Sequence, residues 1–329
     1  ARSHRLALDK CFYSDNGSTA VEVACKMAYQ YWRNIAPPPP SSVLGPPSPP
    51  RTRFLALDHA YHGDTMGAVS VGGIPLFHAA FQSLCFPVDF VPPPHPDPAA
   101  TLAALDARLR ALPDAYAAII VEPLVLGAGG MLFYPPPILR QIHQLARQHN
   151  TLLIFDEVIT GFGRTGTMFA GQQGGVTPDL MCLSKGLTAG YLPLGATLAT
   201  QRVFDAFYAD PNAHQGANLT KTFFHGHTFT GHPLACAVAL ASLDLFDSTH
   251  LLAHVRKMSA LLADYLRQAR GLPHVFNPRS LGLIGALDLR ALDGTAFPYS
   301  WRIGGALCRH LRDQGLLLRP LADTLVIMP

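Results

Sequence analysis

The chain has 329 residues, of which 49% are apolar and 14% charged, so it can bury a sizeable core, and intrinsic disorder is excluded for most of its length. Its formal net charge of +3 is too small to indicate a nucleic-acid-binding protein. No apolar run reaches the roughly 18 residues of a membrane-spanning helix, and the start has no hydrophobic secretory segment. The six cysteines are far apart, which favours free thiols in a reducing compartment. We therefore expect a cytoplasmic protein (mitochondrial in a eukaryote) without nucleic-acid or membrane partners.

Short apolar runs alternate with amphipathic segments over the first 231 residues. Near-continuous apolar strands separated by helices are typical of a mostly parallel sheet covered on both faces. The pattern predicts an α/β large domain over residues 1–231, with the proline-rich stretch 37–50 as a surface insertion. Helices are predicted at Thr19–Trp32, Leu102–Leu112 and Pro137–Gln148, and strands at Arg53–Leu57, Ala117–Val121, Leu152–Asp156, Leu180–Leu183 and Ala196–Ala199.

After Gly231 the pattern changes to long helices followed by short apolar runs. This pattern predicts a small α+β domain over residues 232–329. Helices are predicted at Pro233–Phe246, Leu251–Ala269 and Trp301–Gln314, an apolar stretch at Leu281–Leu289, and strands at Leu316–Arg319 and Leu325–Met328.

The first motif with chemical content is DEVITGFGRTG at residues 156–166. Asp156 ends a buried strand, so it lies at the sheet edge where ligands of open α/β sheets bind. The same motif contains G-x-G-x-x-G spacing over residues 161–166, which suggests a dinucleotide site. No convincing helix follows, as that site requires, so a glycine-rich loop is the better interpretation.

Lys185 follows the next apolar strand and precedes a glycine, in a chain with only five lysines. A lysine is usually a solvated charge, but at this sheet edge it faces the same side as Asp156. Desolvation or nearby positive charge turns a lysine amine into a nucleophile towards aldehydes. A carboxylate and such a lysine are the pair that pyridoxal phosphate (PLP) requires, one for the pyridine nitrogen and one for the aldehyde.

A phosphate site and an aromatic residue would complete such a cofactor site. Gly17 and Ser18 precede a predicted helix, whose free N–H groups and positive dipole end favour an anion. The alternative for this segment is an ordinary helix N-cap. Tyr61 follows the strand Arg53–Leu57 and is placed to stack on a ring, with core packing as its alternative.

Six motifs together resemble the class III (subgroup II) PLP-dependent aminotransferases. They occur in the family's order, from about Cys11 to Met328, as FYSDNGSTAVEVACKMA, YHGDTMGAVSV, VEPLVLGAGGM, LLIFDEVITGFGRTG, PDLMCLSKGLTAGYLPL and FFHGHTFTGHPLACAVA. YHGDT, DNGS and HGHTF are most similar to the branch of this family that acts in biotin biosynthesis. The resemblance implies a fold-type I PLP transferase, with a large PLP-binding domain and an incomplete small C-terminal domain, and with the family's N-terminal segment absent.

By motif, the resemblance implies a role for individual residues. Lys185 would be the Schiff-base lysine, Asp156 the partner of the pyridine nitrogen, and Tyr61 the aromatic near the ring, while Gly17 and Ser18 would bind phosphate. Support for the site is implied for His62, Asp64, Glu122 and Arg164.

The resemblance also implies a homodimer with shared active sites. Thr228 would reach the phosphate bound by the neighbouring subunit, and Gly226 and His227 would line the same edge. The alternative for this segment is a loop of its own chain that caps the helix beginning near Pro233. Arg319 matches the arginine that holds the substrate's carboxylate.

Three other interpretations stay open at this point. One is a different class III enzyme, acting on ornithine, 4-aminobutyrate or another ω-amine, and one is a truncated relative without turnover. The third, a metal enzyme using His225, His227 and His232 or His59 and His62, fits no standard zinc spacing, so no metal is expected. The amino donor is open between S-adenosylmethionine and lysine.

Overall fold

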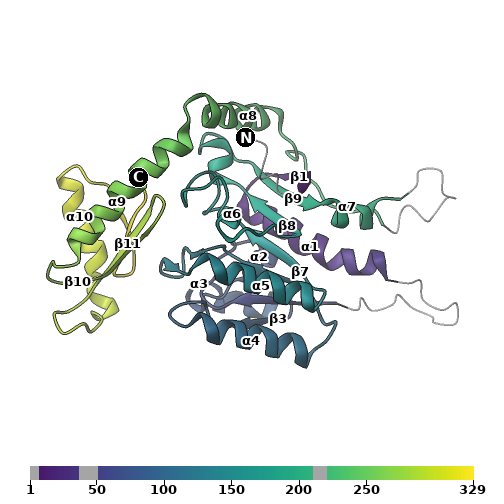
Figure 1. Ribbon diagram of the computed structural model, residues 1–329, viewed down its shortest axis with the longest axis horizontal. Coiled ribbons are helices and arrows are strands. Elements are labelled where there is room, and N and C mark those ends of the chain that lie inside the picture. Colours follow the sequence, from purple (N-terminus) through teal and green to yellow (C-terminus); the bar gives the residue numbers. More distant parts are fainter. Residues whose placement is uncertain (1–6, 37–50, 210–220) are drawn as a thin grey trace.

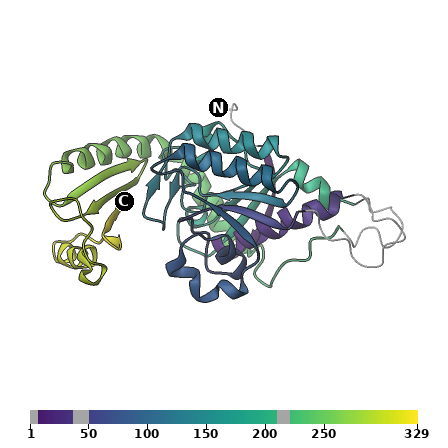
Figure 2. The same cartoon turned by 90° about the horizontal axis from the view of Figure 1, so that it is seen from below.

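The structure is a computed structural model that describes residues 7–36, 51–209 and 221–329. The insertion expected at residues 37–50 lies outside the described residues. A large sheet with helices on both faces forms the main body, and a smaller sheet with its own helices stands at one end of the molecule (Figures 1 and 2).

The large sheet has the strand order β1-β9-β8-β7-β4-β2-β3. Its strands are β1 (Leu8–Ser14), β2 (Arg53–Leu57), β3 (Val88–Val91), β4 (Tyr116–Val121), β7 (Leu152–Asp156), β8 (Leu180–Leu183) and β9 (Gly195–Thr200). All neighbouring pairs from β3 to β8 are parallel, whereas β9 runs antiparallel to both β8 and β1. Strand β1 therefore runs in the same direction as the parallel strands.

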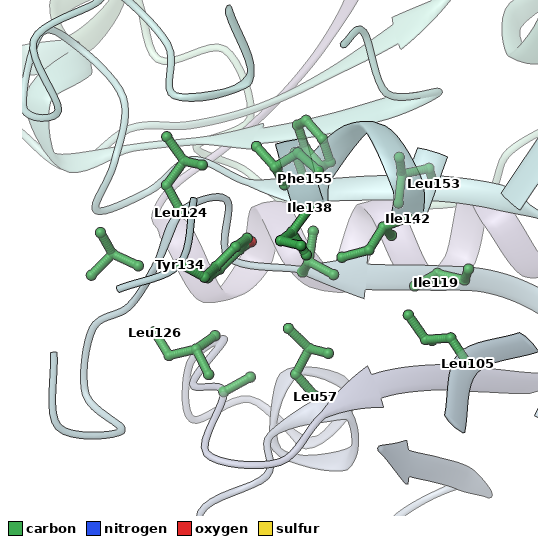
Figure 3. Close-up of a cluster of buried hydrophobic side chains, with 14 of the residues drawn as sticks. Leu57, Leu105, Ile119, Leu124, Leu126, Tyr134, Ile138, Ile142, Leu153 and Phe155 are labelled. Atoms are coloured by element: carbon green, nitrogen blue, oxygen red, sulfur yellow. The ribbon is translucent and has the colours of Figure 1, made fainter. Parts of the chain in front are cut away.

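Helices cover the two faces of the large sheet as two separate apolar layers. On one face α4 and α5 pack against β2, β4 and β7, and Figure 3 shows Leu105 and Ile142 opposite Ile119 and Leu153. On the other face lie α1, α2 and α7. The elements are α1 (Gly17–Ile35), α2 (Met66–Val71), α3 (Pro75–His78), η1 (Ala79–Leu84), α4 (Pro98–Ala111), α5 (Pro136–Gln148), α6 (Gly171–Gly174), η2 (Lys185–Thr188) and α7 (Gln201–Phe207), with a short ribbon of β5 (Val125–Leu126) and β6 (Leu132–Phe133).

The start of α1 is fixed by its own sequence. Asn16 accepts a hydrogen bond from the Thr19 amide (3.0 Å), and the Thr19 hydroxyl accepts one from the Asn16 amide (3.1 Å), which is a reciprocal capping box. Buried residues then recur at helical spacing from Ala20 to Trp32 and face the sheet. The helix N-terminus is therefore held at the end of β1.

The small sheet has the order β10-β11-β13-β12 and is antiparallel. Helix α8 crosses the large body, and α9 leads to the small sheet (Figure 1). The elements are α8 (Pro233–Ser248), α9 (Leu251–Ala269), β10 (Val275–Leu281), β11 (Ile284–Leu289), η3 (Tyr299–Trp301), α10 (Ile303–Asp313), β12 (Arg319–Leu321) and β13 (Thr324–Ile327).

This architecture confirms the predicted fold class of a mostly parallel α/β sheet plus a small α+β unit. One predicted strand is displaced: Leu316–Arg319 is not a strand along its length, because β12 begins only at Arg319. Gly315 has a φ of +84° and ends the turn after α10, so the chain enters the sheet later than its apolar residues suggest.

Within the described residues, no single helix is long and apolar enough to span a membrane. Helices α8 and α9 meet the length and composition criterion only as a pair, and they are bent by 72° relative to each other. All six cysteines are free thiols.

Truncation of Ile119 in the centre of β4 tests the core of the large sheet. Ile119 is fully buried, so Ile119→Ala should lower the free energy of unfolding by about 2–5 kcal/mol through lost burial and a residual cavity. Urea unfolding followed by fluorescence measures the change. Leu272→Ala, at a residue that is 57% exposed, is the matched control and should stay within about 0.5 kcal/mol of the wild type. Equal effects of the two changes would contradict this assignment of the core.

Candidate active site

The carboxyl ends of the parallel strands gather the predicted residues at one edge of the large sheet. Asp156 is the last residue of β7, and it is level with Cys182 in β8, close before Lys185. Glu122 directly follows β4, and the N-terminus of α1 directly follows β1. Since β1 runs in the direction of the parallel strands, all of these groups lie at the edge where open α/β sheets bind ligands.

Asp156 and His62 form a buried pair. The Nδ1 atom of His62 lies 2.7 Å from Oδ2 of Asp156, and their side chains are 0% and 5% exposed. The other carboxylate oxygen of Asp156 accepts the amide N–H of Val158 (3.0 Å). Within the described residues, the buried Nε2 atom of His62 has no hydrogen-bond partner. The pair holds the Asp156 carboxylate in a fixed orientation and leaves it further acceptor capacity.

Glu122 joins two loops at this edge. Its Oε1 atom accepts the N–H of Tyr61 (2.9 Å), and its Oε2 atom accepts the N–H of Gly127 (3.0 Å). Burial raises the pKa of this carboxyl group to about 7, and the negative charge of Asp156 acts in the same direction. The backbone bearing Tyr61 is thereby attached to the carboxyl end of β4.

The ring of Tyr61 lies in an aromatic group beside this edge. It stacks on His78 at a ring-centroid distance of 6.2 Å and meets Phe77 edge-on at 6.0 Å. Burial, and then the neighbouring Asp64, raise the pKa of the Tyr61 hydroxyl to about 12. The phenol therefore stays protonated at neutral pH and acts as a flat, uncharged surface.

Lys185 occupies the first turn after β8. Its φ of +45° is left-handed, and its side chain is exposed, so the chain does not supply the desolvation that the sequence suggests for this amine. The following Gly186 is pressed against Phe162, where a Cβ atom would lie 2.8 Å from the phenylalanine Cβ. This close contact fixes the backbone that carries Lys185.

The N-terminus of α1 contains Gly17 and Ser18, the two residues expected to bind phosphate. Within the described residues, the N–H groups of Gly17 and Ser18 have no acceptor, as is usual for a first helical turn. The Ser18 hydroxyl contacts that of Thr65 (2.8 Å) and accepts the Thr65 N–H (2.9 Å). A Cβ atom on Gly17 would lie 2.8 Å from Val158, so this helix end touches the segment after Asp156.

The segment that contains Gly226, His227 and Thr228 lies along α1 of the same chain. Lys26 and Gln30 of α1 donate hydrogen bonds to backbone carbonyls of this segment. His227 lies 3.7 Å from Asp15, next to the helix N-terminus. Thr228 is exposed and has no hydrogen-bond partner in the part of the chain that the structure describes.

The two predicted arginines belong to the small sheet or contact its segments. Arg319 begins β12 in the small sheet, and its side chain is exposed. Arg164 donates to the backbone carbonyls of Leu283 (3.3 Å) and Pro329 (2.8 Å), so it holds the small sheet rather than a ligand. Burial lowers its pKa.

Two residues that the sequence analysis did not single out support the site. Glu157 is fully buried and accepts the N–H groups of Ala170 and Gly171 at 3.0 and 2.8 Å, which closes the glycine-rich loop after Asp156. Arg279 joins the small sheet to the loop that follows Glu122. Most of their partners are backbone N–H or carbonyl groups, which every residue type except proline can offer, so a local motif does not reveal them.

The glycine-rich segment after Asp156 is a series of turns without a following long helix. The next helix, α6, spans only Gly171–Gly174. This geometry agrees with the interpretation of a structural loop rather than a dinucleotide-binding turn.

Comparison with known proteins places this arrangement in a family. The aminotransferase class-III family matches residues 3–329. The chain is 47% identical to an adenosylmethionine-8-amino-7-oxononanoate aminotransferase of Geobacter sulfurreducens, over 98% of this chain and 70% of that protein. It is 42% identical to the protein of the same name from Aquifex aeolicus, with the same coverage of both.

Solved structures give the same result. The crystal structure of the adenosylmethionine-8-amino-7-oxononanoate aminotransferase of Methanocaldococcus jannaschii has a TM-score of 0.89 at 33% identity and covers 98% of this chain and 71% of that one. An amine transaminase from an uncultivated Pseudomonas species, in its PLP-bound form, has a TM-score of 0.86 at 34% identity. The match covers 99% of this chain and 77% of that one. The chain belongs to the class-III aminotransferases, as its motifs predict, and is an enzyme of the transaminase type.

The raised pKa of Glu122 predicts that the stability of the protein depends on pH. Its pKa of about 7 lies above the ordinary value of 4.5, so the folded chain keeps a proton that the unfolded chain loses between these values. The contribution to the free energy of unfolding is therefore present at low pH and is lost as the pH rises to 7.

Comparison of the wild type with the variant Glu122→Gln should isolate the pH dependence that Glu122 contributes to the free energy of unfolding. The free energy of unfolding of the wild type, minus that of the variant, should fall between pH 4.5 and 7 and then level off. Urea titrations at a series of pH values measure it. Glu157, whose pKa burial also raises to about 7, is present in both proteins and cancels. A difference that does not change with pH would contradict the assignment.

Proposed function

We propose that this chain transfers an amino group from S-adenosylmethionine (or lysine) to 8-amino-7-oxononanoate, giving 7,8-diaminononanoate in biotin biosynthesis, with PLP as cofactor. The observation that carries the proposal is the 47%, 42% and 41% identity to relatives named for this reaction, each over 98% of the chain. The PLP-bound state of a solved relative supports the cofactor.

The residues at the sheet edge fit this cofactor. The N–H groups at the start of α1, which have no acceptor in the part of the chain that the structure describes, suit a phosphate because they and the helix dipole both favour an anion. The buried carboxylate of Asp156, oriented by His62, suits a protonated pyridine nitrogen. Gly17 and Ser18 would hold the phosphate, Tyr61 would lie near the ring, and Lys185 would carry the aldehyde.

PLP supplies an electron sink for the carbanion that forms when a proton leaves the amine-bearing carbon. Lys185 Nζ would take that proton and return it at the other end of the transfer, as general base and acid. Asp156 would hold a positive charge on the ring nitrogen, and His62 keeps the carboxylate from turning away. Arg319 would bind the carboxylate of the acceptor.

Lys185→Ala should abolish both cofactor attachment and turnover. The visible absorbance band of lysine-bound cofactor should disappear, and transamination should fall by at least about a hundredfold, because the amine both binds and transfers the proton. Absorbance spectra and a coupled assay measure the two effects. Lys257→Ala, at an exposed residue of α9, is the matched control and should leave both unchanged. Retained turnover in Lys185→Ala would remove this mechanism.

Asp156→Asn should keep the cofactor bound but slow the chemistry. The amide cannot stabilise a positive charge on the ring nitrogen, so we expect a loss in kcat of about a hundredfold to a thousandfold. Pre-steady-state absorbance of each half-reaction measures it. A rate within about twofold of the wild type would contradict the role of Asp156.

We also propose a homodimer in which the Thr228 loop of one copy completes the phosphate site of the other. Large apolar side chains are exposed in this loop and in the helix α8 that follows it, among them Phe229 (60%), Leu234 (66%) and Leu240 (64%), which is typical of a surface that another chain covers. The Thr228 hydroxyl, which has no hydrogen-bond partner among the described residues, agrees with this arrangement. The contact between His227 and Asp15 supports the alternative, in which the loop serves its own chain.

Complementation between variants distinguishes the two arrangements. Chains with Lys185→Ala and chains with Thr228→Val are mixed and allowed to exchange, after each parent has been shown to be inactive. A mixed dimer should regain activity, because one of its sites receives an intact lysine and an intact threonine. Mass spectrometry confirms that heterodimers form. Heterodimers without activity would show that Thr228 serves its own chain.

The substrate assignment is tested by an acceptor and donor screen. The proposal expects amino transfer to 8-amino-7-oxononanoate from S-adenosylmethionine or lysine, followed as loss of the cofactor's visible band. Turnover of ornithine, 4-aminobutyrate or simple ω-amines instead would assign the chain to another branch of the family, and the similarity to the amine transaminase makes this comparison necessary.

A further inference from the structure

Arg279, on β10, joins the small sheet to the large body through backbone carbonyls. Its Nε atom donates to the carbonyl of Met131 (2.8 Å), and its Nη2 atom donates to that of Gly130 (2.7 Å). Its Nη1 atom donates to Asp288 on β11 (3.0 Å) and to the carbonyl of Asn277 (2.8 Å). The side chain is only 10% exposed. One buried guanidinium thus connects two parts of the chain that are almost 150 residues apart in the sequence.

The carbonyls that Arg279 contacts belong to a turn attached to the candidate site. The N–H of Met131 donates to the carbonyl of Gly127 (3.0 Å), and the N–H of Gly127 donates to Glu122 (3.0 Å). Glu122 in turn accepts the N–H of Tyr61. The turn also lies directly on the Tyr61 loop, because a Cβ atom at Gly129 would be 2.1 Å from the carbonyl oxygen of His59. The turn 127–131 is therefore fixed relative to the cofactor side of the site.

On the other side, Asp288 carries the connection into the small sheet. It accepts the hydroxyl of Thr324 on β13 (2.9 Å) in addition to Arg279. Strand β13 pairs with β12, where Arg319 is opposite Val326. Arg279, Asp288 and β13 thus form a continuous set of contacts from the Tyr61 loop to the strand that bears Arg319.

A second set of contacts holds the hairpin between β10 and β11 against the large body. The N–H of Leu283 donates to the carbonyl of Arg164 (2.8 Å). Gly282, with a φ of +60°, lies so close that a Cβ atom would be 2.3 Å from the carbonyl carbon of Thr165. Ile284 and Ala286 of β11 are fully buried in the main core. The hairpin between β10 and β11 is consequently seated between the loops that follow Glu122 and Asp156.

We propose that Arg279 is a positioning residue for the acceptor: it sets where Arg319 lies relative to the ring of the cofactor. This inference rests on the proposed function, which gives Arg319 the acceptor's carboxylate. A planar fork can donate to two adjacent carbonyls and a carboxylate at once, whereas a lysine ammonium is a point charge without that geometry. Arg279→Lys therefore keeps the charge beside Asp288 but loses the double contact with the turn.

The test is a double-mutant cycle between Arg279→Lys and Arg319→Leu. Arg279→Lys should raise the KM for 8-amino-7-oxononanoate about tenfold, because the carboxylate meets a displaced Arg319. Its kcat should stay within about twofold, and its cofactor band should not change, since no cofactor-binding residue is altered. In the Arg319→Leu background, Arg279→Lys should change KM by less than about twofold. Independent, multiplicative effects of the two changes would overturn the proposal.

Amide hydrogen exchange tests the contacts of Arg279 with the turn 127–131 without any turnover. Exchange at Gly127–Met131 and at residues 281–284 should accelerate in Arg279→Lys. Arg290→Lys is the matched control and should leave exchange and KM unchanged. It changes the arginine that directly follows β11, whose side chain, among the described residues, donates a hydrogen bond only to the carbonyl of Gly294 (3.4 Å). Unchanged exchange in Arg279→Lys would overturn the proposal. A wild type that never shows the cofactor band would instead overturn the proposed function, so the two failures are distinguishable.

Thr324→Val keeps the proposal testable if Arg279→Lys does not fold. The substitution removes only the hydroxyl that Asp288 accepts and preserves the shape of β13. It should raise the KM for the acceptor in the same direction by a smaller factor, again only when Arg319 is present. A Thr324→Val enzyme with the KM of the wild type would contradict the route through Asp288.

Discussion

The candidate site depends on the parallel, in-register pairing of β4, β7 and β8. Val121 is level with Phe155, and Asp156 is level with Cys182, so the residues that end these strands arrive at the same edge. The strands are fully buried, and apolar layers on both faces of the sheet prevent them from sliding. A shift of one residue would turn every side chain to the opposite face, so the core that stabilises the sheet also aligns the site.

That edge concentrates buried carboxylates whose oxygens are hydrogen-bonded. Asp156 is paired with His62, Glu122 accepts two backbone N–H groups, and Glu157 accepts two more together with a hydroxyl. Burying a carboxylate is costly unless its oxygens are hydrogen-bonded. The raised pKa of both glutamates shows that the hydrogen bonds only partly offset this cost. These carboxylates attach the loops to the sheet, and because they are buried away from water, breaking one of their hydrogen bonds would leave an unpaired oxygen.

The sequence predicts the parts of the fold that depend on local pattern. The strands Arg53–Leu57, Leu152–Asp156 and Leu180–Leu183 have the predicted bounds, because uninterrupted apolar runs of this length are buried on both faces. Strand β1 was not predicted. In the described part of the chain it lies at the sheet edge beside β9, and its exposed residues Asp9, Cys11 and Tyr13 alternate with the partly buried Lys10 and Phe12, so no buried apolar run marks it.

The same distinction holds for the candidate site. Lys185 and Asp156 are recognisable because a strand end and a motif coincide at each of them. The pairing of His62 with Asp156 joins residues 94 positions apart, and the structure was needed to show it. Arg279 is harder still to find from the sequence, because its partners in the large body are carbonyl groups, which every residue carries. Its importance follows only from the conformation of the turn that it meets.

The conformation of the turn 127–131 explains why an arginine is suited to position 279. Gly130 and Met131 both have positive φ angles, +111° and +53°, and for a methionine this conformation is strained. A turn of this kind directs two successive carbonyls to one side, and a guanidinium fork can satisfy both. Because the bonds go to the backbone, they constrain the conformation of the turn rather than its side chains. The hydrogen bonds of Arg279 therefore join the small sheet to the large body through a turn whose conformation they constrain.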